Sequence, residues 1–167
     1  FPNINGQQSS TSVSKVGTAT LFYFDYTDAA LIYTLDNRPT VVKPLQRLSF
    51  GSPLTLCLYG TASRAPDVNY QDLWWNASES GWGINFTQQV TQQGDIIFAT
   101  WFTYDYTGAA LPMSATLRKV GTNSYSGTLI RTSGPPFNAL PFNPDSVTRA
   151  EVGTATVTFT NGNAAKF

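Results

Sequence analysis

The sequence predicts an all-β protein, an antiparallel barrel or sandwich of about eight strands. Aromatic residues make up 14% of its 167 residues, and 13 glycines and 10 prolines accompany them. Rings and β-branched side chains suit a pleated sheet, whereas glycine and proline suit the turns between strands. No window of about 11 residues shows helical periodicity. Short strands joined by tight turns are therefore expected throughout.

All four tryptophans lie between residues 72 and 113. Residues 82 to 87 alternate between apolar and polar side chains, which is typical of a strand with one buried face. Residues 96 to 104 carry apolar side chains on both faces, so we expect this strand to be covered on both sides. The two strands are predicted to pair as a hairpin whose loop is residues 88 to 93.

Further strands are expected where β-branched or aromatic runs are bounded by turn residues. Pro44 confines its strand to a sheet edge or a bulge, and Asn161-Gly162 is a strong hairpin turn. The further predicted strands are residues 15 to 24, 30 to 35, 41 to 50, 114 to 120, 125 to 132, 152 to 160 and 164 to 167.

Composition divides the chain into four parts. We interpret residues 1 to 12 as an N-terminal arm, 13 to 56 as β-hairpins, 57 to 70 as a linker and 71 to 167 as a tryptophan-rich β unit that forms one domain with 13 to 56. The single cysteine, Cys57, excludes an internal disulfide. It is either a small buried hydrophobe or a bridge to another chain.

Charge and hydropathy exclude several classes of partner. Charged residues make up only 12% of the chain and the formal net charge is zero, so neither a nucleic acid nor an anionic membrane is an expected partner. No apolar run approaches the roughly 18 residues of a membrane span, and we expect no membrane insertion. Low charge, abundant Thr, Ser and Asn, and few thiols favour a secreted or cell-surface protein.

A short repeat occurs near the two ends of the sequence. Residues 16 to 21, VGTATL, recur as residues 152 to 157, VGTATV, and in the same register Leu31 aligns with Phe167. The second copy therefore stops inside its hairpin, whereas the first continues to about Arg47. The chain resembles the back half of one β unit followed by the front of the next, which is a split, or permuted, repeat.

A unit without its closing strands would leave open sheet edges, which soluble proteins avoid. Three arrangements would resolve this: the N-terminal hairpin closes the second unit in the same chain, it closes the unit of a neighbouring chain, or the sequence is a fragment. Exchange between neighbours that does not close on itself generates a fibre. The sequence leaves the three arrangements open.

Four segments resemble a β-repeat family of secreted or surface proteins of proteobacteria. They are ESGWGIN (79 to 85), FATWFTYD (98 to 105), YSGTLIRTSGPPFN (125 to 138) and VGTATVTF (152 to 159). The resemblance implies a secreted or surface location and modular use, with no catalytic residues. Units of that family end in two strands similar to residues 33 to 37 and 43 to 47, which here lie at the opposite end of the chain. In strand count and aromatic content the chain is also similar to small avidin-like barrels.

Histidine is absent from the sequence, which excludes Ser-His-acid and Cys-His catalytic sites and the usual zinc sites. We therefore expect no metal and no cofactor. The remaining enzyme hypothesis is a glycosidase-like carboxylate pair, Glu79 with Asp72 or Asp105. The simpler interpretation is that Glu79 belongs to a Ser-Glu-Ser-Gly turn, so we expect a non-catalytic protein.

The tryptophans have two interpretations, as a core or as an exposed platform for a sugar or a small apolar ligand. Because Trp74 and Trp75 are adjacent, their rings would point to opposite faces of a strand, so at least one should lie off the core. The candidate platform comprises Trp74, Trp75, Asn76, Trp82, Asn85, Trp101 and Tyr104.

The leading functional expectation is an extracellular structural module that associates with copies of itself by β-strand complementation, forming a surface assembly or filament. The alternative is a β-barrel that binds a carbohydrate or a small apolar ligand. The candidate self-association residues are Val16, Thr18, Thr20, Phe22, Phe24 and Phe167.

Overall fold

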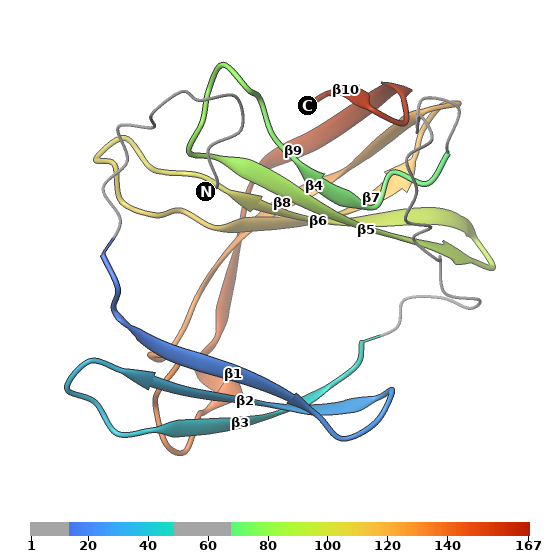
Figure 1. The fold of residues 1–167 in the computed structure, drawn as a ribbon. Coiled ribbons are helices and arrows are strands. Elements are labelled where there is room, and N and C mark those ends of the chain that lie inside the picture. The colour runs from blue at the N-terminus through green and yellow to red at the C-terminus, as the bar shows by residue number, and fades with distance from the viewer. Residues whose placement is uncertain (1–13, 49–67) are drawn as a thin grey trace. The chain divides into compact units, whose positions relative to one another are not determined.

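A computed structural model describes residues 14 to 48 and 68 to 167 (Figure 1). These ranges contain ten β-strands and one short 3₁₀ helix, and every strand pair is antiparallel. The predicted all-β antiparallel class is confirmed, with ten strands instead of about eight. The chain divides into two compact units, Phe1–Ser49 and Phe50–Phe167. The predicted arm and Cys57 lie outside the described residues.

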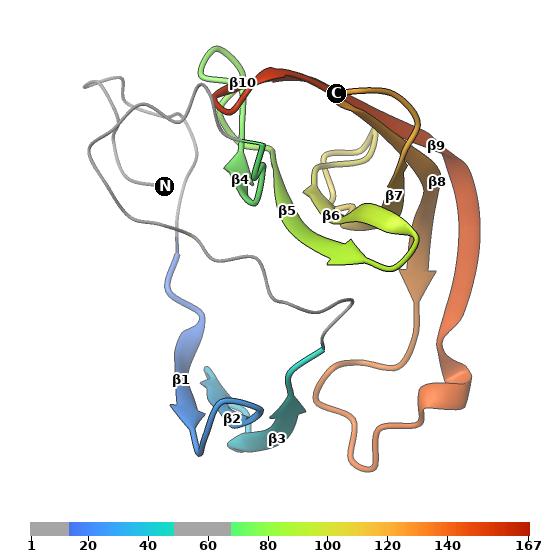
Figure 2. The ribbon, with the colours of Figure 1, turned by 90° about the vertical axis from the view of Figure 1, so that its right-hand side faces the viewer.

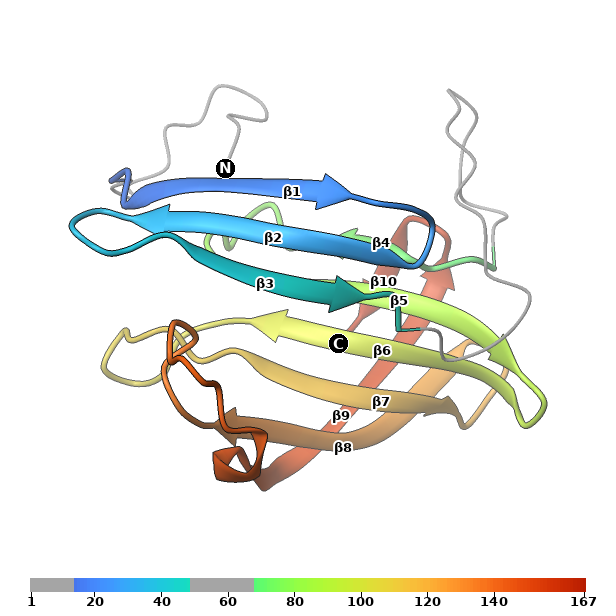
Figure 3. The ribbon, with the colours of Figure 1, turned by 90° about the horizontal axis from the view of Figure 1, so that it is seen from below.

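The first unit is a three-stranded sheet in the order β1-β2-β3 (Figure 3). Asp25 holds the turn between β1 and β2, because its carboxylate accepts hydrogen bonds from the backbone N–H groups of Thr27 and Asp28 at 2.7 and 2.9 Å. Pro44 lies on the edge strand β3, as predicted, where a missing N–H costs no ladder bond. The strands are β1 Gly17–Tyr23, β2 Asp28–Leu35 and β3 Val41–Gln46.

Apolar side chains remain exposed on both faces of this sheet. Leu21 and Phe22 are neighbours in β1 and therefore point to opposite faces, and they are 47% and 54% exposed. Only Ala30, Tyr33 and Val41 are buried hydrophobic residues in this unit's described part. A three-stranded sheet needs at least one well-covered apolar face for independent stability. In the described part of this sheet, little of either apolar face is covered.

The second unit is a seven-stranded antiparallel sheet in the order β10-β9-β8-β7-β6-β5-β4. The sheet curls strongly, so that β9 and β4 approach each other although neither pairs with the other (Figure 2). A 3₁₀ helix, η1 Pro144–Ser146, lies in the loop between β8 and β9. The strands are β4 Asp72–Trp74, β5 Gly83–Thr91, β6 Gly94–Phe102, β7 Met113–Lys119, β8 Ser124–Ser133, β9 Thr148–Asn161 and β10 Ala164–Lys166.

The concave face of the curled sheet carries the hydrophobic core. Phe159, on β9, is 1% exposed. Its ring stacks on Tyr70 with 3.7 Å between centroids, and it contacts Trp74 at 5.3 Å and Phe86 at 5.7 Å. These contacts join strands that are far apart in the sheet order. The buried core comprises Tyr70, Ile84, Phe86, Ile97, Ala99, Ala115, Leu117, Tyr125, Ala155, Val157 and Phe159.

The predicted hairpin of residues 82 to 104 is present as β5 and β6, but its loop is shorter than expected. Strand β5 continues to Thr91, which pairs with Gly94. Gln88 is buried, and its side chain bonds to backbone groups that no described strand pairs with. Its amide oxygen accepts a hydrogen bond from Tyr70 N at 2.7 Å, and its amide nitrogen donates one to Val68 O at 3.1 Å. A glutamine that satisfies backbone groups in this way can occupy a core position.

The sequence repeat is also a structural repeat. In the first copy Tyr23 pairs with Ala29, and at the equivalent positions of the second copy Phe159 pairs with Ala165. In both hairpin turns the side-chain oxygen of the first turn residue accepts a hydrogen bond from the N–H two residues later. The glycine at the second position of each copy has nearly the same φ, 156° in Gly17 and 158° in Gly153. The two hairpins therefore share their register, their turn and their local backbone.

Candidate functional site

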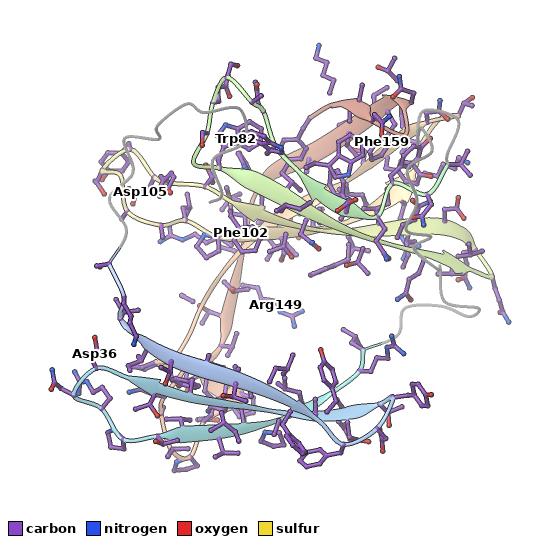
Figure 4. The ribbon with its side chains drawn as sticks, viewed as in Figure 1. Asp36, Trp82, Phe102, Asp105, Arg149 and Phe159 are labelled. Atoms are coloured by element: carbon purple, nitrogen blue, oxygen red, sulfur yellow. The ribbon has the colours of Figure 1, made fainter. Side chains whose placement is uncertain are left out.

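The concave side of the second unit contains a cavity of about 510 Å³. It lies beside β9 and at the end of β10, next to the aromatic core. Trp82 lies at the start of β5 (Figure 4), and the other aromatic walls come from β6 and from the residue after β10. The lining residues are Glu79, Trp82, Trp101, Thr103, Leu129, Thr154, Ala155, Thr156 and Phe167.

One wall of the cavity is fixed by an indole and a carboxylate. Trp82 Nε1 donates a hydrogen bond to Glu79 Oε2 at 3.0 Å. Glu79 is held in its turn by a backbone bond from its N–H to Asn76 O at 3.0 Å. The turn predicted for Glu79 is therefore present, and its carboxylate orients the Trp82 ring at the cavity wall.

A second indole at the cavity, that of Trp101, has a polar atom that no described residue satisfies. Trp101 Nε1 is buried and has no hydrogen-bond partner among the described residues. The Trp101 ring packs edge-on against Phe167, with 5.1 Å between centroids. A buried N–H without an acceptor costs roughly 1 to 3 kcal/mol. The Trp101 ring lines the cavity, while its N–H is buried and not satisfied by a described residue.

The floor of the cavity is an open strand edge. Alternate residues of a strand direct their backbone N–H and C=O groups to opposite sides, and Phe159 N–H bonds to Asn123 O on the β8 side. Thr154 and Thr156 therefore direct theirs away from β8. Strand β10 covers β9 only from Thr158 to Asn161. No strand of the described residues pairs with Thr154 or Thr156 on that side.

The first unit shows what this edge binds when it is covered. Thr18 and Thr20 are the equivalents of Thr154 and Thr156, and they pair with Thr34 and Ile32 of β2. Ladder bonding extends to Asp36, whose N–H donates to Val16 O at 2.9 Å. The same VGTAT sequence is thus a covered strand in the first unit and an open edge beside a cavity in the second.

The structure brings together only part of the predicted aromatic platform. Trp82 and Trp101 line the cavity, whereas Trp74 packs in the core and donates from Nε1 to Tyr70 O at 2.9 Å. Trp75 is 46% exposed, so the adjacent tryptophans do differ in burial, as predicted.

The three polar or phenolic members of the predicted platform lie elsewhere. Asn76 accepts hydrogen bonds from Ser78 N and Oγ within its turn. Asn85 is exposed. Tyr104 is 53% exposed and pairs with Ala110 beyond β6.

The predicted self-association residues also divide into two groups. Those of the first unit lie on or beside β1, and Phe22 packs on Phe24 at 5.3 Å between ring centroids. Phe167 instead belongs to the cavity wall. Sequence reasoning did not assign Leu129 and residues 154 to 156 to a site, although the repeated VGTAT motif marked the latter. The exposed members of the first unit are Val16, Thr18, Thr20, Phe22 and Phe24.

Two acidic turns have similar sequences, DYTDAAL at residues 25 to 31 and DYTGAAL at residues 105 to 111. Asp105, in the loop after β6 (Figure 4), accepts bonds from the Thr107 hydroxyl at 2.6 Å and from the N–H groups of Thr107 and Ala109. These hydrogen bonds lower the pKa of Asp105, and the equivalent bonds in the first hairpin lower the pKa of Asp25. Both carboxylates therefore hold hairpin turns.

Burial dominates the electrostatics of the core. Tyr125 is 1% exposed, and its burial, helped by the nearby Asp95 carboxylate, raises the pKa of its phenol to about 12. Burial also raises the pKa of Tyr70. In residues 14 to 48 and 68 to 167, no three His, Cys, Asp or Glu side chains gather as metal ligands would, and no helix there is long and apolar enough to span a membrane.

No protein-family model, curated protein sequence or solved structure matches this chain.

Proposed function

We propose that this chain is a non-catalytic extracellular structural module that associates with copies of itself by β-strand complementation, forming a surface assembly or filament. In this proposal, strands of the N-terminal sheet of one copy complete the seven-stranded sheet of the next. The observation that carries it is that the VGTAT sequence occurs twice in this chain, once as a strand covered by β2 and once as an open strand edge.

The N-terminal sheet has the character of a donor. Val42 and Leu45 of β3 point to opposite faces, and they are 57% and 38% exposed. Contiguous exposed apolar surface marks an interaction site, and a sheet that is apolar on both faces is suited to insertion between other layers. The low charge of the chain places little repulsion in the way of association between copies.

The seven-stranded sheet has the character of an acceptor. Its β9 edge offers the backbone groups of Thr154 and Thr156 over a cavity with aromatic walls. Main-chain hydrogen bonds supply affinity in strand addition, and side-chain pockets supply specificity. A donor and an acceptor on one chain allow head-to-tail growth when the contact does not close on itself.

The test is the assembly state of the purified chain by light scattering and negative-stain imaging, with Val42→Lys and Leu45→Lys as variants. Each adds a charge to an exposed apolar position, so the fold should persist while assembly is lost. Tyr106→Lys is the matched control, because Tyr106 is fully exposed in a turn of the second unit. A monomeric wild-type chain, or polymers that survive both β3 variants, would refute the proposal.

A second candidate is a binding module for a small ligand, and the aromatic walls of the cavity favour it. The rings of Trp82, Trp101 and Phe167 would cover the apolar side of a sugar or of another small ligand. Titration of sugars and apolar dyes with tryptophan fluorescence as the readout tests this candidate. The absence of any response across the panel would exclude it.

A further inference from the structure

We infer that the cavity beside β9 is the acceptor site for residues 32 to 35 of β2 from a second copy of this chain, with Tyr33 seated in the cavity. This inference rests on the proposed self-association and names its contact. In the exchange, residues 153 to 156 of β9 in one copy take the place that residues 17 to 20 of β1 occupy beside β2 in the other, which is domain swapping.

The register follows from the repeat. In the first unit Ile32 pairs with Thr20, Tyr33 with Ala19 and Thr34 with Thr18. Transferred to the second copy of the motif, these residues pair with Thr156, Ala155 and Thr154 in the same order. The positions beyond Thr156 are already covered by β10 and Phe167. The donor therefore begins at Ile32, directly after the register position of Phe167.

The donor strand offers β9 the ladder that it already forms with β1. Strand β1 presents Val-Gly-Thr-Ala-Thr to β2, and β9 presents the same five residues. The hydrogen-bonding direction is also the same in the two strands. Phe24 N–H bonds to Asp28 O across the first hairpin, so the even-numbered residues of β1 direct their backbone groups toward β2. The even-numbered residues of β9, Thr154 and Thr156, direct theirs toward the open edge. Exchange thus replaces one ladder with an equivalent one and moves Tyr33 from its buried position in the first unit to the cavity.

Side-chain alternation directs Tyr33 into the cavity. Ala155 lies on the concave face, 4% exposed, and directly opposed residues of paired strands share a face. A tyrosine across from Ala155 therefore enters the space between Trp82, Trp101 and Leu129. Its ring would pack against the aromatic walls of the cavity, which Trp82 and Trp101 supply. The cavity thus matches a strand with a central inward aromatic residue.

The two equivalent glycines report whether the donor strand is present. A Cβ placed on Gly17 would lie 2.2 Å from Thr34 O, whereas a Cβ placed on Gly153 would meet nothing within 4 Å. The difference arises because β2 covers β1 at this point and no described strand covers β9. When Thr34 of a second copy docks on β9, Gly153→Ala places a methyl group against its carbonyl.

The experiment titrates a synthetic peptide of residues 32 to 46 into the full chain, with tryptophan fluorescence and calorimetry as readouts. This peptide contains the donor residues and β3 and leaves out the residues that would overlap β10. We expect saturable binding, a tryptophan response, and dissolution of assemblies by excess peptide. The peptide with Tyr33→Ala should bind at least about tenfold more weakly, because it loses its buried ring.

Three variants of the chain test the acceptor. Gly153→Ala should weaken binding at least about tenfold, by the clash and by strain at a residue whose φ is 158°. Thr156→Pro should do the same without that strain, by removing a donor on the open edge. Thr156→Val is the matched comparison, because it loses the hydroxyl but keeps the N–H, and it should lose much less affinity than Thr156→Pro. Urea unfolding of each variant establishes that the second unit remains folded.

The register is tested by cross-linking in a Cys57→Ser background. Thr34→Cys with Thr154→Cys should give covalent dimers and larger species on oxidation, and Thr34→Cys with Thr156→Cys, a slip of two residues, should give few. Equal yields would overturn the register. A cross-linked monomer would overturn the assignment to a second copy.

The outcomes separate this inference from the proposed function. Peptide binding to a chain that stays monomeric supports the acceptor site and refutes self-association. Assemblies that persist in Gly153→Ala and Thr156→Pro support self-association and refute this site. A peptide that does not bind, while a sugar or apolar dye does, would assign the cavity to a small ligand and overturn the inference.

Discussion

Phe159 is the residue on which the curl of the seven-stranded sheet depends most directly. It is 1% exposed and contacts the rings of Tyr70, Trp74, Phe86 and Tyr125. Replacing a buried Phe with Ala typically costs about 3 to 5 kcal/mol, and each aromatic pair adds roughly 0.5 to 1.5 kcal/mol beyond its buried area. We therefore expect Phe159→Ala to lower the free energy of unfolding of the second unit by about 4 kcal/mol.

Urea unfolding followed by tryptophan fluorescence measures this loss selectively, because all four tryptophans lie in the second unit. With a urea dependence of about 2 kcal/mol per molar, the midpoint should fall by about 2 M. Phe102→Ala is the matched control, since Phe102 is on β6 but 51% exposed (Figure 4), and it should change the free energy by about 0.5 kcal/mol. A loss under about 1 kcal/mol for Phe159→Ala, or equal losses for both variants, would refute the assignment of the core.

Three further predictions concern side chains of the second unit. The folded-state pKa of Tyr125 is raised from 10.0 to about 12. Its contribution, about 3 kcal/mol, should therefore be complete below pH 10 and disappear as the pH rises toward 12. The difference in phenolate absorbance between the wild type and Tyr125→Phe isolates this group among the eight tyrosines, and a difference that already appears near pH 10 in the folded protein would contradict the prediction. The pKa of Asp105 is lowered, so its ionised carboxylate should stabilise the fold at pH values above the ordinary pKa of 3.8 and lose that effect as the pH falls further. The urea midpoints of the wild type and Asp105→Ala should therefore converge in acid. A difference that stays constant with pH would argue against the turn's role. Gln88→Leu leaves the buried Tyr70 N–H without its acceptor and should cost about 1 to 3 kcal/mol in urea unfolding, an effect that Gln92→Leu, in the exposed turn, should not share.

The local strand pattern could be predicted from the sequence, because side chains alternate across a strand whatever the strand packs against. Ile84 and Phe86 are buried and Asn85 is exposed, as the alternation of residues 82 to 87 predicts, and Pro44 lies on an edge strand as predicted. The turn at Glu79 and the equivalence of the two VGTAT segments were likewise legible from short stretches of sequence. Each of these properties depends on a few neighbouring residues.

The composition of the cavity and the separation of the two units could not be predicted in this way. Alternation tells which face a residue occupies, but it does not tell which strands meet across a curled sheet. The curl brings Trp82 and Trp101 to Thr154 and Phe167, and it buries Trp74 against Phe159 instead of leaving it on the predicted platform. Sequence therefore determined the strands, their faces and the repeat. Tertiary structure decided which aromatic residues form the core and which line the open edge of β9, because that choice depends on contacts between strands distant in the chain.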